Sequence, residues 1–339
     1  MSGGVDSSVT AALLVEQGFD VTGVYMKNWS QDLPGFYCPW KEDYQDAKRV
    51  AVQLGIDFKM YDFETEYKHK VVDYMLEEFK AGRTPNPDIM CNQEVKFKLF
   101  LNTAIEDGAD MIATGHYARV EDGKLLKAKD DNKDQTYFLY RVTSEALSKT
   151  LFPLGGYTKP EVRELAKARG LATAAKKESM GICFVGKVGI KEFLQQYVES
   201  SPGAIIDQHG TVIGEHDGAI FYTIGQRHGL QVGGGMPLYV VGKDMTKNEV
   251  YVTTDIQDEK LWSNTIPVTS AHWINEEPVT QKLQVRTRHR AKLVDVSKIE
   301  KLDNGNWQMT LSEEIRALTP GQSAVLYADD LVLGGGIVV

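Results

Sequence analysis

The sequence predicts an α/β protein in which a parallel-sheet domain is followed by two small β-rich domains, the last of them barrel-like. Strand and helix patterns alternate over the first 200 residues, and short strands separated by turn residues replace them beyond Ser201-Pro202-Gly203. The 339 residues also exceed what one hydrophobic core usually serves. We therefore expect domains at 1–200, 201–261 and 262–339.

Hydrophobic periodicity predicts the elements of the first domain in order. Apolar residues at helical spacing begin at Val5, and Pro160 stands where the first turn of a later helix tolerates proline. Strands that alternate with helices imply a parallel sheet with helices on both faces. The expected helices cover 5–17, 44–54, 64–79, 92–106 and 159–169, and the expected strands cover 21–26, 56–61 and 110–114.

Beyond residue 201 the predicted strands are short. Each is bounded by turn residues, and Asp303-Asn304-Gly305-Asn306 is typical of a hairpin turn. Such runs indicate small β modules or a barrel and not a continuation of the parallel sheet. The expected strands are 212–214, 218–223, 238–241 and 250–253, and the same pattern continues from Trp262.

The composition is that of a soluble globular protein. Lys and Arg total 38 against 47 Asp and Glu, and the net charge of −9 argues against a general nucleic-acid coat while leaving room for a local basic patch. No apolar run approaches the roughly 18 residues of a membrane span, and no signal peptide is visible at the start. Three cysteines do not make a disulfide scaffold. We expect a cytoplasmic protein with no membrane partner.

Residues 2–8, with the sequence SGGVDSS, run directly into the first predicted helix. Two glycines bring backbone N–H groups close to an anion, the serines add hydroxyl donors, and the helix dipole favours phosphate. A simple N-cap at Ser2 or Asp6 is the alternative interpretation of S-G-G alone. The full heptapeptide resembles the signature of the PP-loop ATP pyrophosphatases, and it lacks the G-K-[ST] of a Walker loop, so the resemblance implies adenylylation. Because PP-loop proteins place this motif after a central strand, the sheet is expected to lack its nucleotide-bearing strand.

The three cysteines differ in their surroundings. Cys38 stands among aromatic residues and is interpreted as a small buried apolar side chain, the commoner role of a free cysteine. Cys91 follows two prolines at the start of a predicted helix, where a thiolate is favoured, and Cys183 lies in a glycine-containing segment with lysines close by. These flanks predict that Cys91 and Cys183 are not core residues. No C-x-x-C pair supports a zinc ribbon, and no metal-ligating residue is assigned.

Further motifs follow in order along nearly the whole chain. Together with the glycine-rich start they resemble the tRNA-specific 2-thiouridylase family of PP-loop enzymes. That family adenylates the C2 oxygen of the wobble uridine in certain tRNAs and then replaces this oxygen with sulfur from a cysteine persulfide, which gives 2-thiouridine. The motifs are Met26-Lys27-Asn28-Trp29, Asn86-Pro87-Asp88 with Cys91-Asn92, Ala113-Thr114-Gly115-His116-Tyr117, Lys133-Asp134-Gln135-Thr136-Tyr137-Phe138-Leu139, Gly181-Ile182-Cys183-Phe184 and Pro320-Gly321-Gln322.

The resemblance implies roles for individual residues. Cys183 carries the persulfide sulfur, Cys91 is the nucleophile that releases it, and Asp88 serves as general acid or base. ATP is expected at Ser2, Gly3, Gly4, Val5, Asp6, Ser7, Ser8, Met26 and Gly115, and the target base at Asn86, Pro87 and Asp88. Contacts with tRNA are expected from His116, Lys133, Asp134, Gln135, Arg288, His289 and Gln322.

General chemistry supports the same two-step reaction independently of the family resemblance. A carbonyl oxygen on a pyrimidine is a poor leaving group and AMP is a good one, so activation must precede attack by sulfur. A persulfide is a strong sulfur donor, and a second cysteine can resolve it by forming a disulfide. The resemblance further implies ATP as cosubstrate, Mg²⁺, tRNAs of the Lys, Glu and Gln types, and a persulfide donor protein, either a cysteine desulfurase or a relay carrier.

Three alternatives stay open. Cys38, Cys91 and Cys183 are enough thiols to hold an iron–sulfur cluster. The chain could instead be a PP-loop ligase of the argininosuccinate-synthase type that acts on a small metabolite and needs no paired cysteines. A tRNA-binding protein without enzymatic activity is the third alternative, and it would release no pyrophosphate.

A basic segment lies in the last domain. Arg286, Arg288, Arg290 and Lys292 alternate at period two, which predicts a strand face with four cations. A solvated edge strand that uses charge against aggregation is the alternative. In an acidic protein with an RNA-modifying signature, we favour a phosphate-binding face.

Overall fold

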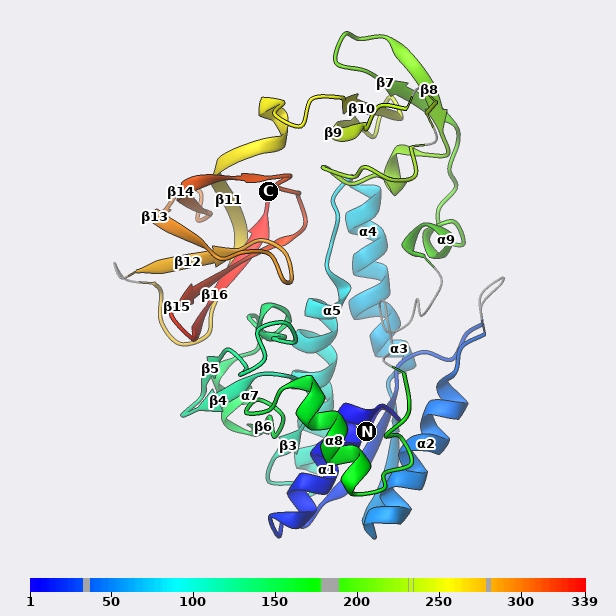
Figure 1. Cartoon of the computed structure of the whole chain (residues 1–339), viewed down its shortest axis with the longest axis vertical. Coiled ribbons are helices and arrows are strands. Elements are labelled where there is room, and N and C mark those ends of the chain that lie inside the picture. The colour runs from blue at the N-terminus through cyan, green and yellow to red at the C-terminus, as the bar shows by residue number, and fades with distance from the viewer. Residues whose placement is uncertain (33–36, 178–188, 231, 234, 279–281) are drawn as a thin grey trace.

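The computed structural model describes residues 1–32, 37–177, 189–230, 232–233, 235–278 and 282–339 (Figure 1). An N-terminal α/β region lies at the bottom of Figure 1, a small four-stranded sheet at the top, and a β-barrel at the upper left. The predicted fold class, a parallel-sheet domain followed by two β-rich domains of which the last is a barrel, is confirmed.

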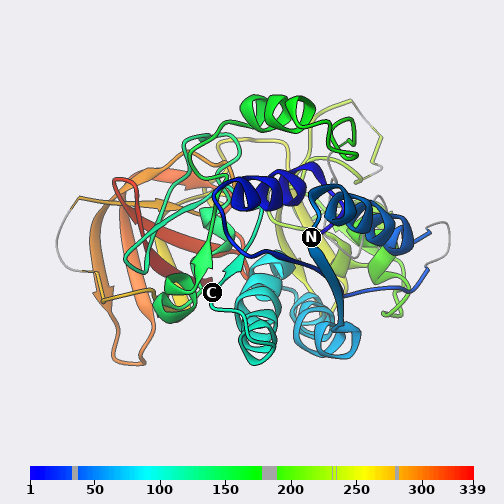
Figure 2. The same ribbon diagram turned by 90° about the horizontal axis from the view of Figure 1, so that it is seen from below.

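The parallel strands of the first region form two pairs. Strand β1 (Thr22–Lys27) pairs with β2 (Asp57–Asp62), and β3 (Ile112–Ala113) pairs with β6 (Thr150–Leu151). Among the described residues these pairs are separate sheets. Figure 2 shows the blue and green helices on one side of β1 and the cyan helices on the other. The blue and green helices are α1 (Val5–Glu16), α2 (Trp40–Leu54) and α8 (Lys159–Ala168).

Two long helical stretches, both predicted from the sequence, have π-helical middle segments. Their wider turns follow i→i+5 hydrogen bonds and are frequent at functional sites. The second stretch begins earlier than expected because Pro87 occupies its first turn and the Asn86 side chain caps it. The first consists of α3 (Glu64–Tyr67), η1 (Lys68–Asp73) and α4 (Tyr74–Lys80), and the second of α5 (Pro87–Met90), η2 (Cys91–Phe100) and α6 (Leu101–Glu106).

Helix α8 starts where the sequence predicts. Thr158 and Glu161 form a capping box, and Pro160 lies in the first turn. The caps fix the first residue of the helix, Lys159, whose side chain is ion-paired with Asp6 in the first turn of α1. None of the helices in the described ranges combines the length and apolar character that crossing a membrane requires.

The central module (residues 203–253) contains a four-stranded sheet. A strand predicted at 218–223 is wrong: Gly218 has a φ of 146°, and a 3-10 turn, η4 (Ala219–Phe221), follows it. The short helix α9 (Ile190–Leu194) precedes the module. In spatial order the strands are β8 (Val212–His216), β7 (Gly203–Ile206), β10 (Glu249–Thr253) and β9 (Tyr239–Asp244).

Six strands close into the C-terminal barrel because β16 pairs with both β15 and β11. A Cβ atom at Gly334 would lie 2.1 Å from the carbonyl oxygen of His272, so glycine is required where the barrel closes. The hairpin predicted at 303–306 joins β13 to β14. The strands are β11 (Trp262–Trp273), β12 (Leu283–Arg286), β13 (Val294–Lys301), β14 (Trp307–Arg316), β15 (Ser323–Ala328) and β16 (Leu331–Val338).

The barrel is continuous with the first region. Strand β5 (Lys124–Leu126) pairs with β16, and β4 (Arg119–Glu121) completes this added hairpin. The main hydrophobic core includes Leu125 and Tyr137 from the first region together with Tyr327 from the barrel. The barrel is therefore held against the residues that follow β3.

Candidate active site

Residues 2–8, which the sequence predicts to bind phosphate, form a tight loop at the N-terminus of α1, and we call them the phosphate loop. Gly4 is the N-cap, so the helix begins at Val5 inside the motif, and Gly3 has a left-handed backbone with a φ of 73°. A Cβ atom at Gly3 would lie 2.3 Å from the carbonyl oxygen of Asp43, so only glycine fits between the loop and α2. The first N–H groups of α1 thus meet at a place that favours phosphate.

The serines of the loop differ in their burial and in their hydrogen bonds. The Ser2 amide donates to Ser7 Oγ at 3.1 Å, and Ser7 Oγ donates to the Gly4 carbonyl at 3.2 Å. Ser8 is fully buried, donates to the same carbonyl at 2.8 Å and accepts from Thr173 at 2.9 Å. Ser7 therefore remains within reach of a ligand, whereas Ser8 stabilises the loop from behind.

The carboxylate of Asp6 lies in a polar network that sequence reasoning missed. Lys159 Nζ lies 2.7 Å from Asp6 Oδ1 and 2.9 Å from Asp6 Oδ2, and the Tyr117 hydroxyl donates to Oδ1 at 3.0 Å. Lys159 is only 7% exposed, so its ammonium group is held beside the phosphate loop. No motif could have indicated this pair, because its members are 153 residues apart.

Gly115 packs directly on the loop. A Cβ atom there would lie 2.9 Å from the Ser7 amide nitrogen and 3.0 Å from the Asp6 carbonyl carbon. Met26, the other residue expected at the adenosine, lies on β1 and packs partly buried against the main core. The structure therefore brings the Gly115 motif to the phosphate loop.

The loop expected at the target base leads into α5. Burial raises the pKa of the Asp88 carboxyl, and the charge of Lys96 opposes this shift. Cys91 is 3% exposed within the main core, and burial raises the pKa of its thiol. The prediction of an exposed thiolate at a helix N-terminus is wrong, because α5 precedes Cys91 and Tyr67 and other core residues cover it.

Lys96 is a second residue that the sequence analysis missed. It stands five positions after Cys91 in η2, where i→i+5 spacing places both side chains toward one face. Its Nζ lies 3.5 Å from His116 Nε2, and its charge lowers the pKa values of Asp88 and Cys91 against the effect of burial. Burial holds the pKa of His116 well below its usual value, and Thr114 Oγ1 lies 2.8 Å from its Nδ1. His116 is therefore neutral and lies between the two sites.

Two of the three cysteines lie in the described residues. Cys38 is buried, and desolvation raises the pKa of its thiol, which agrees with the predicted role as a small core residue. Cys183 lies outside the described residues. The chain before it is anchored at Lys176, whose Nζ lies 2.7 Å from Asp43 and 2.6 Å from Asp46, next to the phosphate loop.

The residues expected at tRNA between 133 and 135 have mixed exposure. Asp134 is 1% exposed, and its Oδ1 accepts from the Thr136 amide and hydroxyl at 2.7 and 2.5 Å. Gln135 Oε1 accepts from the Tyr117 amide at 2.9 Å. Asp134 and Gln135 therefore shape this loop, and Lys133 is the member that carries positive charge.

The basic segment is not the strand face that the sequence predicts. Strand β12 ends at Arg286, the Ala291 amide donates to the Arg288 carbonyl, and Arg290 has a left-handed backbone with a φ of 63°. The cations that follow therefore lie on a loop. Arg290 Nε donates to the Asn132 carbonyl at 2.8 Å, which joins this loop to that of Lys133.

His289 confirms that the two loops meet. Its ring centroid lies 4.6 Å from that of Phe138, and burial with the charges of Arg290, Arg286 and Lys133 lowers its pKa to about 4. Arg288 donates to the Ala317 carbonyl at 2.7 Å and to Thr319 Oγ1 at 2.9 Å. We call Lys133, Arg286 and Arg290 the basic cluster, and the uncharged ring of His289 lies beside them.

Comparisons with known proteins cover the whole chain. Residues 1–187 match the family model described as "tRNA methyl transferase HUP domain", 191–254 the "tRNA methyl transferase PRC-barrel domain" and 263–338 the "Aminomethyltransferase beta-barrel domain". Proteins named tRNA-specific 2-thiouridylase MnmA from Bacillus thuringiensis (strain Al Hakam) and Idiomarina loihiensis are each 48% identical, over 344 and 350 residues. All of this chain is aligned, with 93% and 94% of the two relatives.

The chain belongs to the tRNA-specific 2-thiouridylase family. Membership agrees with the resemblance seen in the sequence motifs. It also explains why one chain combines a phosphate loop with two β-rich modules, since the family models follow in that order.

The residues of the site fit the phosphate groups of a nucleotide. The N-terminus of α1 favours an anion, and the glycines Gly3 and Gly115 let the loop pack directly against α2 and against the 115 segment, where a Cβ atom would meet backbone atoms. Among the described residues no group of three His, Cys, Asp or Glu side chains could hold a metal ion by itself. An iron–sulfur cluster that includes Cys183 therefore stays a prediction.

Proposed function

We propose that this chain is a cytoplasmic, ATP-dependent tRNA 2-thiouridylase that adenylates the wobble uridine and then transfers sulfur to it. One observation carries the proposal: the dipeptide Gly115-His116 joins two sites. Gly115 packs on the phosphate loop, and His116 contacts Lys96, whose charge acts on Asp88 and Cys91. Activation and sulfur transfer thus share one region of the fold.

The first step uses the phosphate loop. The C2 oxygen of uridine attacks the α-phosphorus of ATP, the bond to the β-phosphate breaks, and pyrophosphate leaves. The N-terminus of α1 and the Lys159 ammonium stabilise the charge that develops on the leaving group. Mg²⁺ bound with ATP would neutralise phosphate charge, and Asp6, whose oxygens bond to Lys159 and Tyr117, would have to exchange one of these partners to hold the ion.

The second step uses the two cysteines. The terminal sulfur of a persulfide on Cys183 attacks C2 and expels AMP, and Cys91 then attacks Cys183 Sγ. A Cys91–Cys183 disulfide forms, the sulfur stays on C2, and a thiol reductant restores both cysteines. Because burial raises its pKa, the Asp88 carboxyl holds a proton more tightly than an exposed aspartate does and is suited to exchange a proton with the base.

The test is nucleoside analysis of tRNA with an unmodified wobble uridine after incubation with ATP, Mg²⁺ and a persulfide donor. We expect 2-thiouridine that depends on ATP. Consumption of ATP with a small metabolite and no change in tRNA would favour the ligase alternative. Binding of tRNA without pyrophosphate release would favour the non-enzymatic alternative.

We also propose that the basic cluster binds tRNA phosphates. Replacing Lys133 and Arg290 with Gln removes two charges, so the slope of log affinity against log salt is expected to become shallower by between about 1.4 and 1.8 units, with ATP affinity unchanged. The matched control is the pair Lys260→Gln and Lys298→Gln, which removes two exposed lysines elsewhere. A slope equal to that of the wild type would exclude phosphate contacts at Lys133 and Arg290.

We propose that the charge of Lys96 favours ionisation of the Cys91 thiol. Burial raises the Cys91 pKa and the Lys96 charge opposes it, so Lys96→Met should move the midpoint of Cys91 alkylation to higher pH. Lys96→Arg keeps the charge and should leave the midpoint near that of the wild type. Peptide-resolved mass spectrometry after alkylation at several pH values measures this, and an unchanged midpoint in Lys96→Met would contradict the assignment.

A further inference from the structure

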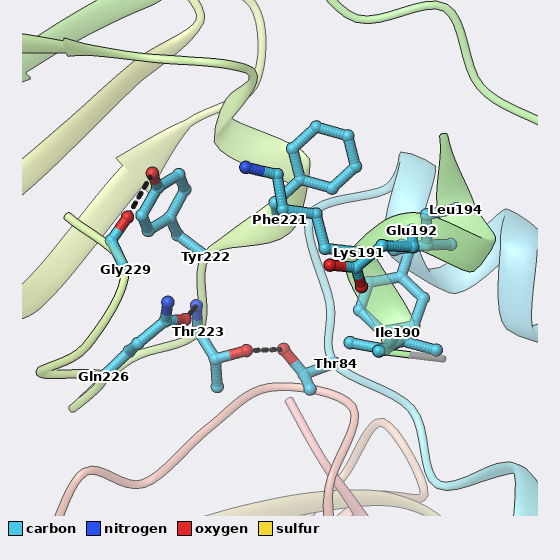
Figure 3. A pocket seen from close by; sticks show the side chains of 12 residues that line it. Thr84, Ile190, Lys191, Glu192, Leu194, Phe221, Tyr222, Thr223, Gln226 and Gly229 are labelled. Atoms are coloured by element: carbon cyan, nitrogen blue, oxygen red, sulfur yellow. Dashed lines mark hydrogen bonds between the residues drawn. The ribbon is translucent and has the colours of Figure 1, made fainter. Parts of the chain in front are cut away.

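Thr84 is the point at which the three parts of the chain meet. Its amide donates to the Pro320 carbonyl at 2.8 Å, and its carbonyl accepts from Gln322 Nε2 at 2.7 Å. Its hydroxyl lies 3.1 Å from the hydroxyl of Thr223 in the central module (Figure 3). All three polar groups of one residue are therefore bonded to the two β-rich modules.

The surroundings of Thr84 are closely packed on one side and open on the other. A Cβ atom at Gly321 would lie 2.8 Å from the Thr84 amide nitrogen, so the barrel approaches Thr84 as closely as glycine permits. A cavity of about 350 Å³ adjoins it, lined by Phe221 of the central module and by Lys191 of α9 (Figure 3). Thr84 and Thr223, whose hydroxyls are hydrogen-bonded to each other, both line this cavity.

Thr84 also begins the segment that leads to the reacting groups. We call residues 84–88 the target-base loop. Pro85 and Pro87 restrict the backbone between Thr84 and Asp88, and Asn86 Oδ1 accepts from the Asp88 amide at 3.2 Å. A displacement of Thr84 is therefore passed on to Asp88 and to Cys91 in the following helix.

We propose that Thr84 is a positioning residue that aligns the target-base loop with both β-rich modules, and that Gln322 helps to hold Thr84 in place. The inference rests on the proposed function. Its support is geometric: Gln322 Nε2 is bonded to the Thr84 carbonyl, on the segment that contains the proposed target-base residues.

The test compares Thr84→Val, which removes only the hydroxyl, with Thr84→Ser, which keeps it. Loss of one partly buried hydrogen bond corresponds to about fivefold, so we expect kcat for tRNA-dependent pyrophosphate release to fall about fivefold in Thr84→Val and to recover in Thr84→Ser. KM values for ATP and tRNA should not change. Thr246→Val, at an exposed turn of the central module, is the matched control.

Thr223→Val is a second variant that tests the same hydrogen bond from its other side. Because both hydroxyls belong to one bond, Thr223→Val should reproduce the loss in kcat, and the double variant should be no slower than either single variant. Gln322→Met removes the hydrogen bond to the Thr84 carbonyl and should also lower kcat. Additive losses in the double variant, or a normal kcat in Gln322→Met, would overturn the proposal.

A readout without tRNA separates this proposal from the proposed function. Cys91 is 3% exposed, so its alkylation requires local opening of the segment that Thr84 holds. We expect alkylation of Cys91 to be about fivefold faster in Thr84→Val than in the wild type or Thr84→Ser. Equal rates would overturn the positioning role even if the wild type thiolates tRNA. A faster rate would support it even if the wild type released no pyrophosphate.

Discussion

Replacing Lys159 with methionine is expected to lower the rate of tRNA-dependent pyrophosphate release by about 10²- to 10³-fold. The ammonium group lies 2.7 Å from Asp6 in a site where Lys159 is 7% exposed, so its charge is poorly screened. Binding of tRNA should persist, because the basic cluster lies on other loops. Pyrophosphate release and a tRNA filter-binding assay measure the two effects.

Matched variants make this result specific. Lys167→Met removes an exposed lysine from the same helix and should leave pyrophosphate release unchanged. Asp6→Ala should lose activity as Lys159→Met does, because it removes the carboxylate of the loop and with it an ion pair of Lys159. Normal release by Lys159→Met or Asp6→Ala would remove the adenylation step from the proposed function.

Local signals in the sequence predicted much of the fold. Helix α8 starts at Lys159 because Thr158, Pro160 and Glu161 determine its caps through neighbouring residues alone. The error at 218–223 has a local cause too, since Gly218 turns the backbone into η4 in spite of a β-rich composition. The pairing of β5 with β16 could not be predicted from the sequence, because the two strands are far apart along the chain.

The sequence predicted the motifs of the candidate site but not the contacts among its residues. The glycines of the phosphate loop follow from the sequence, because close backbone approach requires them. The positions of Lys159 and Lys96 depend on tertiary packing, and single lysines carry no motif. The burial of Cys91 depends on the earlier start of the helix at Pro87, which reverses the expected effect on its thiol pKa.

The cysteines should separate activation from sulfur transfer. Cys91→Ser is expected to release pyrophosphate with tRNA at a rate near that of the wild type and to lower 2-thiouridine formation by at least about 10³-fold, since a serine hydroxyl cannot resolve a persulfide. Cys183→Ser should have the same two properties because a hydroxyl cannot carry the sulfur. Pyrophosphate release and nucleoside analysis on the same reaction measure both quantities.

Cys38→Ser is the matched control for the Cys91→Ser variant. Cys38 and Cys91 are both buried and both have thiol pKa values raised by desolvation, so a loss due to burial of a hydroxyl would affect the two variants alike. We expect Cys38→Ser to thiolate tRNA. If it loses thiolation as Cys91→Ser does while still releasing pyrophosphate, all three cysteines are needed, and visible absorption of anaerobically purified protein should then reveal an iron–sulfur cluster. Retained thiolation by Cys91→Ser would exclude the disulfide step altogether.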